Sequence, residues 1–520
     1  MSAPSYFGRP DVRAWMAVLL FVAATALLRI HLIDSPLERD EGEYAYSGQL
    51  MLQGIPPYQL AVNMKLPGTY AAYALILAAF GQSIGAIHAG LLLANAGAIV
   101  LIYLIGRKLY SAPAGLAACA AYALLSVGAG VLGTQAHATH FVVLAALAGL
   151  WLLLRYADAP RAGMLFASGL LFGVAFLMKQ HGIFFGVFGA GYLLLVSPER
   201  WPVRLRKLGI FLAGAATPFA LTCLLLWRAG VFARFWFWTF TYARRYVSEN
   251  SLADGVAALV ETFRPILRDS GALWALAAVG LALTCQSIRN GRKAAWLLPA
   301  LLAFSFAAVC PGLYFRPHYV VLMLPAVALL AGACVRGRLS ACIFAAALIL
   351  SLAVQRDFLF RMTPVEMSRE LYGPDPFPEA IRIAAYIRSH TAPDALIAVL
   401  GSEPEIYFYA RRHSATPFLY TEPMVEPQPF ALTMQNDMVH DLEQAAPEYV
   451  VRFPIEETLS LGPDSPTRLY DWWADYGPKH YRLVAIADIL PDGHTEYRWD
   501  ESAEAYRPQS LYHLAVYRRR

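Results

Sequence analysis

Charged residues are scarce in this 520-residue sequence: they make up 15% of it, whereas an ordinary soluble domain is about a quarter charged. Hydrophobic residues instead reach 58% and arrive in repeated runs about as long as a bilayer is thick. This composition excludes a single large soluble domain, a disordered chain and a fibrous one. The six cysteines all lie in apolar runs, without a CxxC pair or a metal-type spacing, so we expect no disulfide framework.

Signatures of nucleotide binding and of serine hydrolases are also missing. No glycine-rich phosphate loop follows a predicted strand, and no serine nucleophile elbow is present. We therefore assign no certain cofactor, and we expect no nucleic-acid partner.

Charge divides the chain into two parts. Residues 1–356 hold 27 Lys and Arg against 12 Asp and Glu, a net of +15, and residues 357–520 hold 15 against 25, a net of −10. We predict a transmembrane domain over 1–356 and a soluble domain over 357–520. The second part alternates helical patterns (378–389, 403–411, 469–476) with strand patterns (395–400, 449–453, 483–487, 514–517), which predicts a C-terminal α/β domain.

Hydropathy predicts about eleven spans in a polytopic α-helical membrane protein. They lie at roughly 14–31, 84–105, 113–131, 138–154, 163–178, 182–196, 208–227, 271–288, 294–310, 318–335 and 340–356. The first span lacks a small-residue cleavage site, so we interpret it as retained rather than as a signal peptide. The apolar stretch Leu66–Phe80 is short and rich in tyrosine, which favours an interfacial or re-entrant helix over a further span.

Lys and Arg between the spans predict the orientation, because such residues concentrate on the cytoplasmic side. If Leu66–Phe80 does not cross, the basic connections all fall on one side; they contain Arg9 and Arg13, Arg107 and Lys108, Arg155 and Arg161, Arg200 to Lys207, Arg289 to Lys293, and Arg336 and Arg338. We expect that side to be the cytoplasm. Residues 32–83, 228–270 and everything after 356 then lie outside, on the periplasmic or extracellular face of a bacterial inner membrane.

Acidic residues are concentrated in the first outer loop. Five of the twelve acids of residues 1–356 lie within ten positions: Asp34, Glu38, Asp40, Glu41 and Glu43. Carboxylates held at a membrane surface are costly and tend to be functional. The alternative is structural: Asp40 as the N-cap of an amphipathic helix running to about Gln53, with Glu43 as its capping-box partner.

Three stretches carry a family resemblance. They are Arg39-Asp40-Glu41-Gly42-Glu43-Tyr44-Ala45 after the first span, Lys65-Leu66-Pro67-Gly68-Thr69-Tyr70 in the same loop, and residues 314–319 (YFRPHY) followed by 324–330 (LPAVALL). Together they resemble the GT-C glycosyltransferases of family 39, which include protein O-mannosyltransferases and the lipid A aminoarabinose transferase. Two departures leave the sugar and the acceptor open: Gly68 stands where a second proline is usual, and Thr134–His140 lacks the Asp that relatives often carry there.

The resemblance implies transfer of a sugar from a polyprenyl-phosphate donor to an extracytoplasmic acceptor, which is a lipid, a glycan or a protein. Such a donor carries its own leaving group, so the enzyme needs a base for the acceptor's proton and cations for the phosphate. We assign the base to Asp40, with Glu41 as the second catalytic carboxylate. We assign the phosphate to Lys65, Arg316 and Lys179, and substrate contacts to Glu43, Tyr44, His318 and Tyr319. Each cation also has a structural alternative. Lys65 would extend its charged end to the membrane interface, and Arg316 with His318 would cap the span that follows them. Lys179 would donate hydrogen bonds to carbonyls at the end of a helix.

Two further features allow more than one interpretation. His137 and His140 share a face if both are helical, and His318 joins them in a divalent-cation site; the alternative is helix-end histidines that form hydrogen bonds, and we assign no metal ligand. The aromatic and basic run 234–246 is typical of a membrane anchor, although it also suits a polyprenyl groove or a sugar platform.

Two rival functions remain. A transporter or lipid flippase would place ionisable residues inside its spans, whereas the spans here hold only Arg29 and the acids gather in one outer loop. A catalytically inactive anchor for the soluble domain is the other, and it predicts that an Asp40→Asn variant loses nothing.

Overall fold

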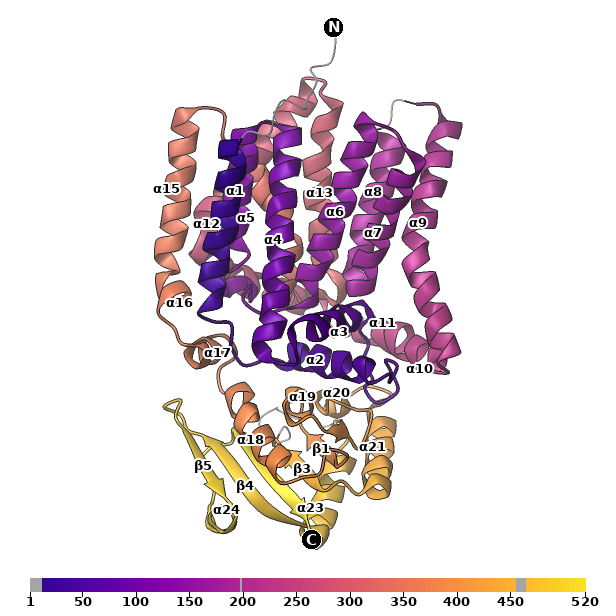
Figure 1. Cartoon of the computed structure of the whole chain (residues 1–520), viewed down its shortest axis with the longest axis vertical. Coiled ribbons are helices and arrows are strands. Elements are labelled where there is room, and N and C mark those ends of the chain that lie inside the picture. Colours follow the sequence, from indigo (N-terminus) through magenta and orange to yellow (C-terminus); the bar gives the residue numbers. More distant parts are fainter. Residues whose placement is uncertain (1–11, 197–198, 455–463) are drawn as a thin grey trace.

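The computed structural model describes residues 12–196, 199–454 and 464–520, which form a helical bundle with a smaller domain at one end (Figure 1). Eleven helices of these residues coincide with the predicted spans, and the polytopic helical fold class is confirmed. They are α1 (Val12–Ile30), α4 (Ile84–Leu109), α5 (Ala112–Leu125), α6 (Ala138–Asp158), α7 (Ala162–Met178), α8 (Ile183–Leu195), α9 (Trp201–Arg228), α12 (Leu252–Arg289), α13 (Leu297–Val309), α14 (Leu324–Ala333) and α15 (Arg338–Val354).

The eleven helices fall into two groups by length. Five of them, α1, α4, α6, α9 and α12, are long and apolar enough to cross a membrane, and the other six are shorter apolar helices. Four of the shorter ones have neighbouring 3₁₀ turns: η1 (Ala129–Val131) beyond α5, η2 (Gln180–Gly182) before α8, η4 (Lys293–Trp296) before and η5 (Pro311–Leu313) after α13, and η6 (Pro317–Leu322) before α14. Helix α12 has non-helical dihedrals at Ser270, where the predicted span begins. The number of helices that cross a bilayer stays a prediction.

The basic connections lie together, as predicted. The links between α4 and α5, α6 and α7, α8 and α9, α12 and α13, and α14 and α15 are all at the end of the bundle opposite the smaller domain (Figure 1). Arg9 falls outside the described residues. The assignment of this end to the cytoplasm rests on the distribution of Lys and Arg.

Two helices of the first loop lie across the other end of the bundle. Helices α2 (Arg39–Leu52) and α3 (Gly68–Phe80) run between the bundle and the smaller domain instead of along the spans (Figure 1). The stretch predicted at Leu66–Phe80 is thus a helix across the end of the bundle, as expected of an interfacial helix, and that it does not cross the bilayer stays a prediction. On the same level, α10 (Phe232–Trp236), the π-helical η3 (Phe237–Tyr242) and α11 (Ala243–Tyr246) continue from α9.

In its described residues, the smaller domain is an α/β unit with one mixed six-stranded sheet. The strands are β1 (Leu396–Leu400), β2 (His413–Ser414), β3 (Tyr449–Arg452), β4 (Tyr481–Ile489), β5 (Thr495–Trp499) and β6 (His513–Arg519). Their order is β2-β1-β3-β6-β4-β5, in which β1 pairs parallel with β2 and β3 and the other pairs are antiparallel. The helices are α18 (Phe377–Ser389), α19 (Glu405–Ala410), α20 (Glu422–Val425), α21 (Ala431–Ala445), α23 (Arg468–His480) and α24 (Glu501–Ala505).

Two short helices, α16 (Arg356–Phe360) and α17 (Pro364–Tyr372), join the bundle to this domain. Phe358, Leu359 and Met367 are buried in the apolar core of the bundle, so these two helices pack with the transmembrane part.

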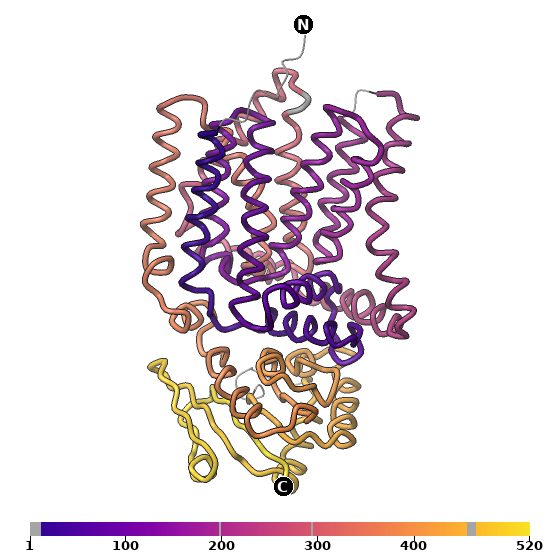
Figure 2. The backbone as a smooth tube through the Cα atoms, in the orientation of Figure 1, coloured from indigo at the N-terminus to yellow at the C-terminus, as the bar shows by residue number. Residues whose placement is uncertain are grey.

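The soluble domain shares a core with the first loop. Buried side chains of α2 and α3, among them Tyr46 and Tyr73, form one cluster with Tyr407 of α19 and with residues of the sheet. A backbone bridge joins Val62 to Phe418, and the Val62 amide donates to the Pro417 carbonyl at 2.9 Å. The chain trace shows the first loop lying between bundle and soluble domain (Figure 2). The domain is therefore docked on this loop by burial of apolar surface.

Helices α2 and α19 approach so closely that only glycine fits at position 42. A Cβ built on Gly42 would lie 2.6 Å from the amide nitrogen and 2.7 Å from the Cβ of Glu405. Backbone atoms cannot move aside as a flexible side chain does, so any larger residue must push the soluble domain away.

A Gly42→Ala substitution is expected to destabilise the docked domain by roughly 1–3 kcal/mol, as overpacking does in a close-packed core. The readouts are thermal unfolding and protease sensitivity of the purified protein. Gly163→Ala is the control, because nothing lies within 4 Å of a Cβ at that helical position. Equal melting curves for the two variants would contradict this tight contact.

Candidate active site

The first turn of α2 is capped by residues other than those weighed in the structural alternative. Glu38 is the N-cap, its side chain accepts from the Glu41 amide at 2.9 Å, and Glu41 completes the capping box. The helix begins two residues earlier than that alternative required, so capping by Asp40 and Glu43 is wrong. Asp40 is thereby free to face the space beside the helix end.

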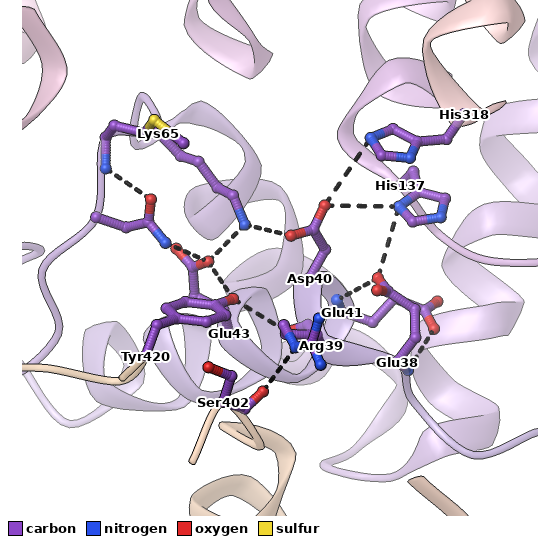
Figure 3. A network of polar contacts seen from close by, with 12 residues as sticks. Glu38, Arg39, Asp40, Glu41, Glu43, Lys65, His137, His318, Ser402 and Tyr420 are labelled. Carbon is purple, nitrogen blue, oxygen red and sulfur yellow. Dashed lines mark hydrogen bonds and ion pairs between the residues drawn. The ribbon is translucent and has the colours of Figure 1, made fainter. Parts of the chain in front are cut away.

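Asp40 is held by Lys65 from the same loop. The Lys65 ammonium lies 2.6 Å from Oδ1 of Asp40 and 2.5 Å from Oε2 of Glu43 (Figure 3). Burial by itself would raise the pKa of Asp40, but the neighbouring cation outweighs it and holds that pKa well below its usual range. Burial likewise acts to lower the pKa of Lys65, and the two carboxylates raise it instead. Both groups are therefore charged near neutral pH.

Glu43 is the centre of a hydrogen-bond network behind Asp40. Its fully buried carboxylate accepts from Asn63 Nδ2 at 2.8 Å, from Tyr420 of the soluble domain at 2.7 Å, and from the Tyr70 hydroxyl, in addition to Lys65. With four donors on its two oxygens, Glu43 has little capacity left for a substrate.

Glu41 points away from Asp40 toward α4. Its Oε1 lies 3.1 Å from His88 Nε2 and accepts from the Ala136 amide at 2.5 Å. Glu41 therefore ties the loop before α6 to α2. Neither Glu41 nor Glu43 lines the cavity described below, so their contacts favour a positioning role for both; the predicted direct contact of either with substrate is untested.

Two histidines from distant segments meet beside Asp40. The rings of His137 and His318 stack at 4.1 Å and 13°, and their nearest nitrogens lie 3.9 and 4.0 Å from Oδ2 of Asp40 (Figure 3). Burial lowers the pKa of His137 to about 4, so its ring is neutral near pH 7. Among the described side chains, one group of three potential metal ligands has its ligand atoms within 4.8 Å of one another, namely Asp40, His137 and His318. His140, the partner predicted for His137, is not in it.

Asp40, His137 and His318 line one cavity of about 680 Å³ between the bundle and the soluble domain. It brings together seven of the residues assigned from the sequence, namely Asp40, Tyr44, Lys65, Lys179, Arg316, His318 and Tyr319. The Lys179 ammonium lies 4.2 Å from the centre of the Tyr319 ring, and the Arg316 guanidinium 5.4 Å from that of Tyr314. Burial lowers the pKa of Lys179 to about 8. Neither cation forms an ion pair within the part of the chain that the structure describes.

The cavity wall also contains residues that were not among the site residues assigned from the sequence. Glu38 is buried there, and its burial next to Asp40 and Glu41 raises its pKa. Tyr420 and Glu422 come from the soluble domain, and Trp238, Tyr242 and Tyr246 from the aromatic run. Within that run, Trp236 is 46% exposed on the outside of the bundle and Phe237 packs against Phe430. The run therefore combines wall, packing and surface positions.

Comparison with known proteins identifies sequence relatives. A sequence model of the dolichyl-phosphate-mannose-protein mannosyltransferase family matches residues 65–227. A curated undecaprenyl phosphate-alpha-4-amino-4-deoxy-L-arabinose arabinosyl transferase of Pseudomonas aeruginosa is 30% identical over 229 residues, 41% of this chain and 40% of that protein. The chain thus aligns with less than half of this relative's length.

Solved structures share the fold. ArnT from Cupriavidus metallidurans bound to undecaprenyl phosphate superposes with a TM-score of 0.60 at 17% identity, over 96% of this chain and 97% of that one. The Archaeoglobus fulgidus oligosaccharyltransferase in complex with zinc and sulfate gives 0.50 at 14% identity, over 92% and 72%. The chain therefore has the fold of these enzymes, and part of its sequence is similar to the mannosyltransferase family model and to the arabinosyl transferase.

Proposed function

We propose that this protein is a membrane glycosyltransferase that moves a sugar from a polyprenyl-phosphate donor to an extracytoplasmic acceptor. One observation carries the proposal: the half-buried Asp40 carboxylate and two cations without ion pairs line the same cavity, where the helical bundle meets the soluble domain. The sequence relatives support it, since a protein named for undecaprenyl-phosphate-linked arabinose transfer aligns with part of this chain.

Asp40 acts as the base in this proposal. An acceptor hydroxyl attacks the anomeric carbon of the donor sugar, the bond from that carbon to the phosphate oxygen breaks, and the polyprenyl phosphate departs with the bonding electrons. The hydroxyl proton passes to the Asp40 carboxylate, which lies at the cavity wall. Direct displacement of this kind inverts the configuration at the anomeric carbon.

Lys179 and Arg316 bind the donor phosphate. Because neither is neutralised by a carboxylate in the described structure, both have charge available for an anion, and an arginine pairs bidentately with phosphate oxygens. Lys65, the third cation assigned from the sequence, already pairs with Asp40 and Glu43. Lys65 therefore attracts the donor phosphate mainly through its charge, and it holds the Asp40 carboxylate in place.

The position of the cavity suits a donor anchored in lipid. Ile183, at the start of α8, lines the cavity and is an apolar side chain that is 47% exposed. An apolar tail can lie along this surface while its phosphate reaches Lys179, four residues away. The basic connections are at the other end of the bundle, which by the positive-inside rule supports a cavity and a soluble domain on the periplasmic or extracellular side.

The transporter hypothesis depends on charged side chains inside the spans, and the interiors of the predicted spans hold one, Arg29, which has a structural role. Arg29 is buried, but its guanidinium donates to the carbonyls of Gly133 at 2.6 Å and of Ser126 at 2.7 Å. It therefore fastens α1 to the turn after α5 and leaves no charge for a transported solute.

Transfer itself is tested with purified protein in lipid nanodiscs. Radiolabelled polyprenyl-phosphate sugars and a membrane extract are supplied, and label in the lipid, glycan and protein fractions identifies the acceptor class. Label moved by the wild type with any one donor supports the proposal. No transfer with any donor, together with movement of labelled lipid across vesicle membranes, would favour a flippase.

We further propose that Asp40, His137 and His318 bind a divalent cation. All three offer a ligand atom within 4.8 Å of one another, and both nitrogens of His137 and Nε2 of His318 have no hydrogen-bond partner in the described structure. Buried polar atoms without partners are costly, so a ligand for them is expected. One carboxylate with two imidazoles suits zinc, which would polarise an oxygen of the bound substrate.

Metal content is the direct measurement. The wild type, purified without chelator and with zinc supplied, is expected to retain about one ion per chain, and His137→Ala and His318→Ala to retain almost none. His140→Ala is the matched control, since this neighbouring histidine lies outside the group and is expected to keep the ion. A wild type that binds neither zinc nor manganese rules out this site, and His137 and His318 then only line the cavity as uncharged side chains.

A further inference from the structure

The soluble domain holds the first turn of α2 on both sides of Asp40. The Tyr420 hydroxyl donates to Oε2 of Glu43 at 2.7 Å and lies 3.2 Å from the carbonyl oxygen of Arg39 (Figure 3). The Arg39 guanidinium in turn donates to the Ser402 carbonyl at 2.9 Å. Residues 39 and 43 are thus both fixed from outside the membrane part, and Asp40 lies between them.

Three donors share the oxygen of Glu43 that Tyr420 contacts. Oε2 accepts from Tyr420, from Asn63 at 2.8 Å and from the Lys65 ammonium at 2.5 Å. Lys65 uses a second proton on Oδ1 of Asp40 at 2.6 Å. A continuous chain of hydrogen bonds therefore runs from the soluble domain through Glu43 and Lys65 to Asp40.

Docking of the domain does not depend on the Tyr420 hydroxyl. Other polar contacts serve that purpose: the Leu37 amide donates to the Tyr409 hydroxyl at 2.9 Å, and the Ser414 amide donates to the Tyr46 hydroxyl at 2.8 Å. These tyrosines satisfy backbone groups. The Tyr420 hydroxyl instead donates to the Glu43 carboxylate, which also accepts from Lys65, the lysine beside Asp40.

We propose that Tyr420 is a positioning residue: the soluble domain uses it to keep Lys65 shared between Glu43 and Asp40. This inference rests on the proposed function. A carboxylate oxygen that loses one donor binds its remaining donors more strongly. Without the Tyr420 hydroxyl, Lys65 moves toward Glu43, and the Asp40 carboxylate loses the contact that fixes its orientation toward the acceptor.

The experiment compares two tyrosines of one interface. Tyr420→Phe is expected to lower kcat about tenfold and to leave the donor KM within twofold, because Lys179 and Arg316 are unchanged. Tyr409→Phe removes a hydroxyl from the same interface, on an equally half-buried ring, and is expected to keep kcat within twofold. Equal losses of kcat in both variants, or a wild-type kcat for Tyr420→Phe, overturns the proposal.

A double-mutant cycle tests the route through Glu43. In a Glu43→Gln background, Tyr420→Phe is expected to cost less than twofold in kcat, since the contact through which it acts is already changed. A further tenfold loss there would mean that Tyr420 acts independently of Glu43, contrary to the proposal. If Tyr420→Phe does not fold, Glu43→Gln alone must still lower kcat at an unchanged donor KM. Absence of transfer by the wild type, by contrast, counts against the proposed function.

Discussion

An Asp40→Asn variant is expected to lose about 100- to 10,000-fold in kcat, the range over which a positioned general base acts. Asparagine keeps the size of the side chain but takes up no proton, so the acceptor hydroxyl has to attack while still protonated. It also leaves the Lys65 ammonium with Glu43 as its sole carboxylate partner at hydrogen-bond distance in the described structure. The measurement is single-turnover transfer of labelled sugar at saturating donor.

Asp34→Asn is the matched control for this loss. Asp34 belongs to the same acidic loop, but it is exposed and does not line the cavity. Its variant is expected to transfer sugar at the wild-type rate and, like Asp40→Asn, to keep the wild-type melting temperature within a few degrees. Full activity of Asp40→Asn would remove the proposed base and favour the inactive-anchor hypothesis.

Periodicity and charge predicted the architecture well because they reflect burial in lipid. Each apolar run became a helix, and the tyrosine-rich stretch at Leu66–Phe80 became a helix across the end of the bundle. The strands β2 and β5 were missed in the soluble domain. β2 has only two residues, and β5 is a five-residue edge strand whose residues are all half-buried; residues 495–499 (TEYRW) do alternate, but this short pattern was not interpreted as a strand.

The capping residues were misassigned for a reason specific to the helix start. Asp is a preferred N-cap and Glu is not, so Asp40 was the natural candidate. Glu38 caps the helix instead, which places Asp40 at the second helical position and Tyr44 one turn later on the cavity side. Glu41 lies on another face, where it meets His88.

The histidine pair depended on contacts that no local pattern encodes. His137 precedes α6 with extended dihedrals (φ −58°, ψ 149°), so the helical spacing to His140 does not apply to it. Its actual neighbour, His318, is far away in the sequence and arrives through packing of η6 against α6. Tyr420 is similar, since a tyrosine in a soluble domain gives no local sign of a contact with the first loop.

The second large effect is expected from the two cations that have no ion pair. A hydrogen bond to a charged group contributes about 1.5–3 kcal/mol, so loss of two such contacts to the donor phosphate costs roughly 100-fold or more in kcat/KM. An Arg316→Ala, Lys179→Ala double variant is therefore expected to lose at least that much for the donor and to keep the KM of the acceptor. Arg316→Lys is expected to recover only part of it, because an ammonium lacks the planar pair of donors that a phosphate accepts.

Arg268→Ala is the control for this loss: it removes a positive charge near the membrane without removing a side chain that we expect to contact the donor phosphate. Arg268 lies in the predicted outer segment 228–270, but its side chain is 70% exposed and pairs with Asp269. Its variant is expected to bind the donor as the wild type does at every salt concentration tested. The double variant, in contrast, is expected to bind a polyprenyl phosphate without sugar as poorly as it binds the donor, since both ligands present the same phosphate. Normal binding of that lipid by the double variant would show that the phosphate lies elsewhere, and the cavity would then have to hold the acceptor alone.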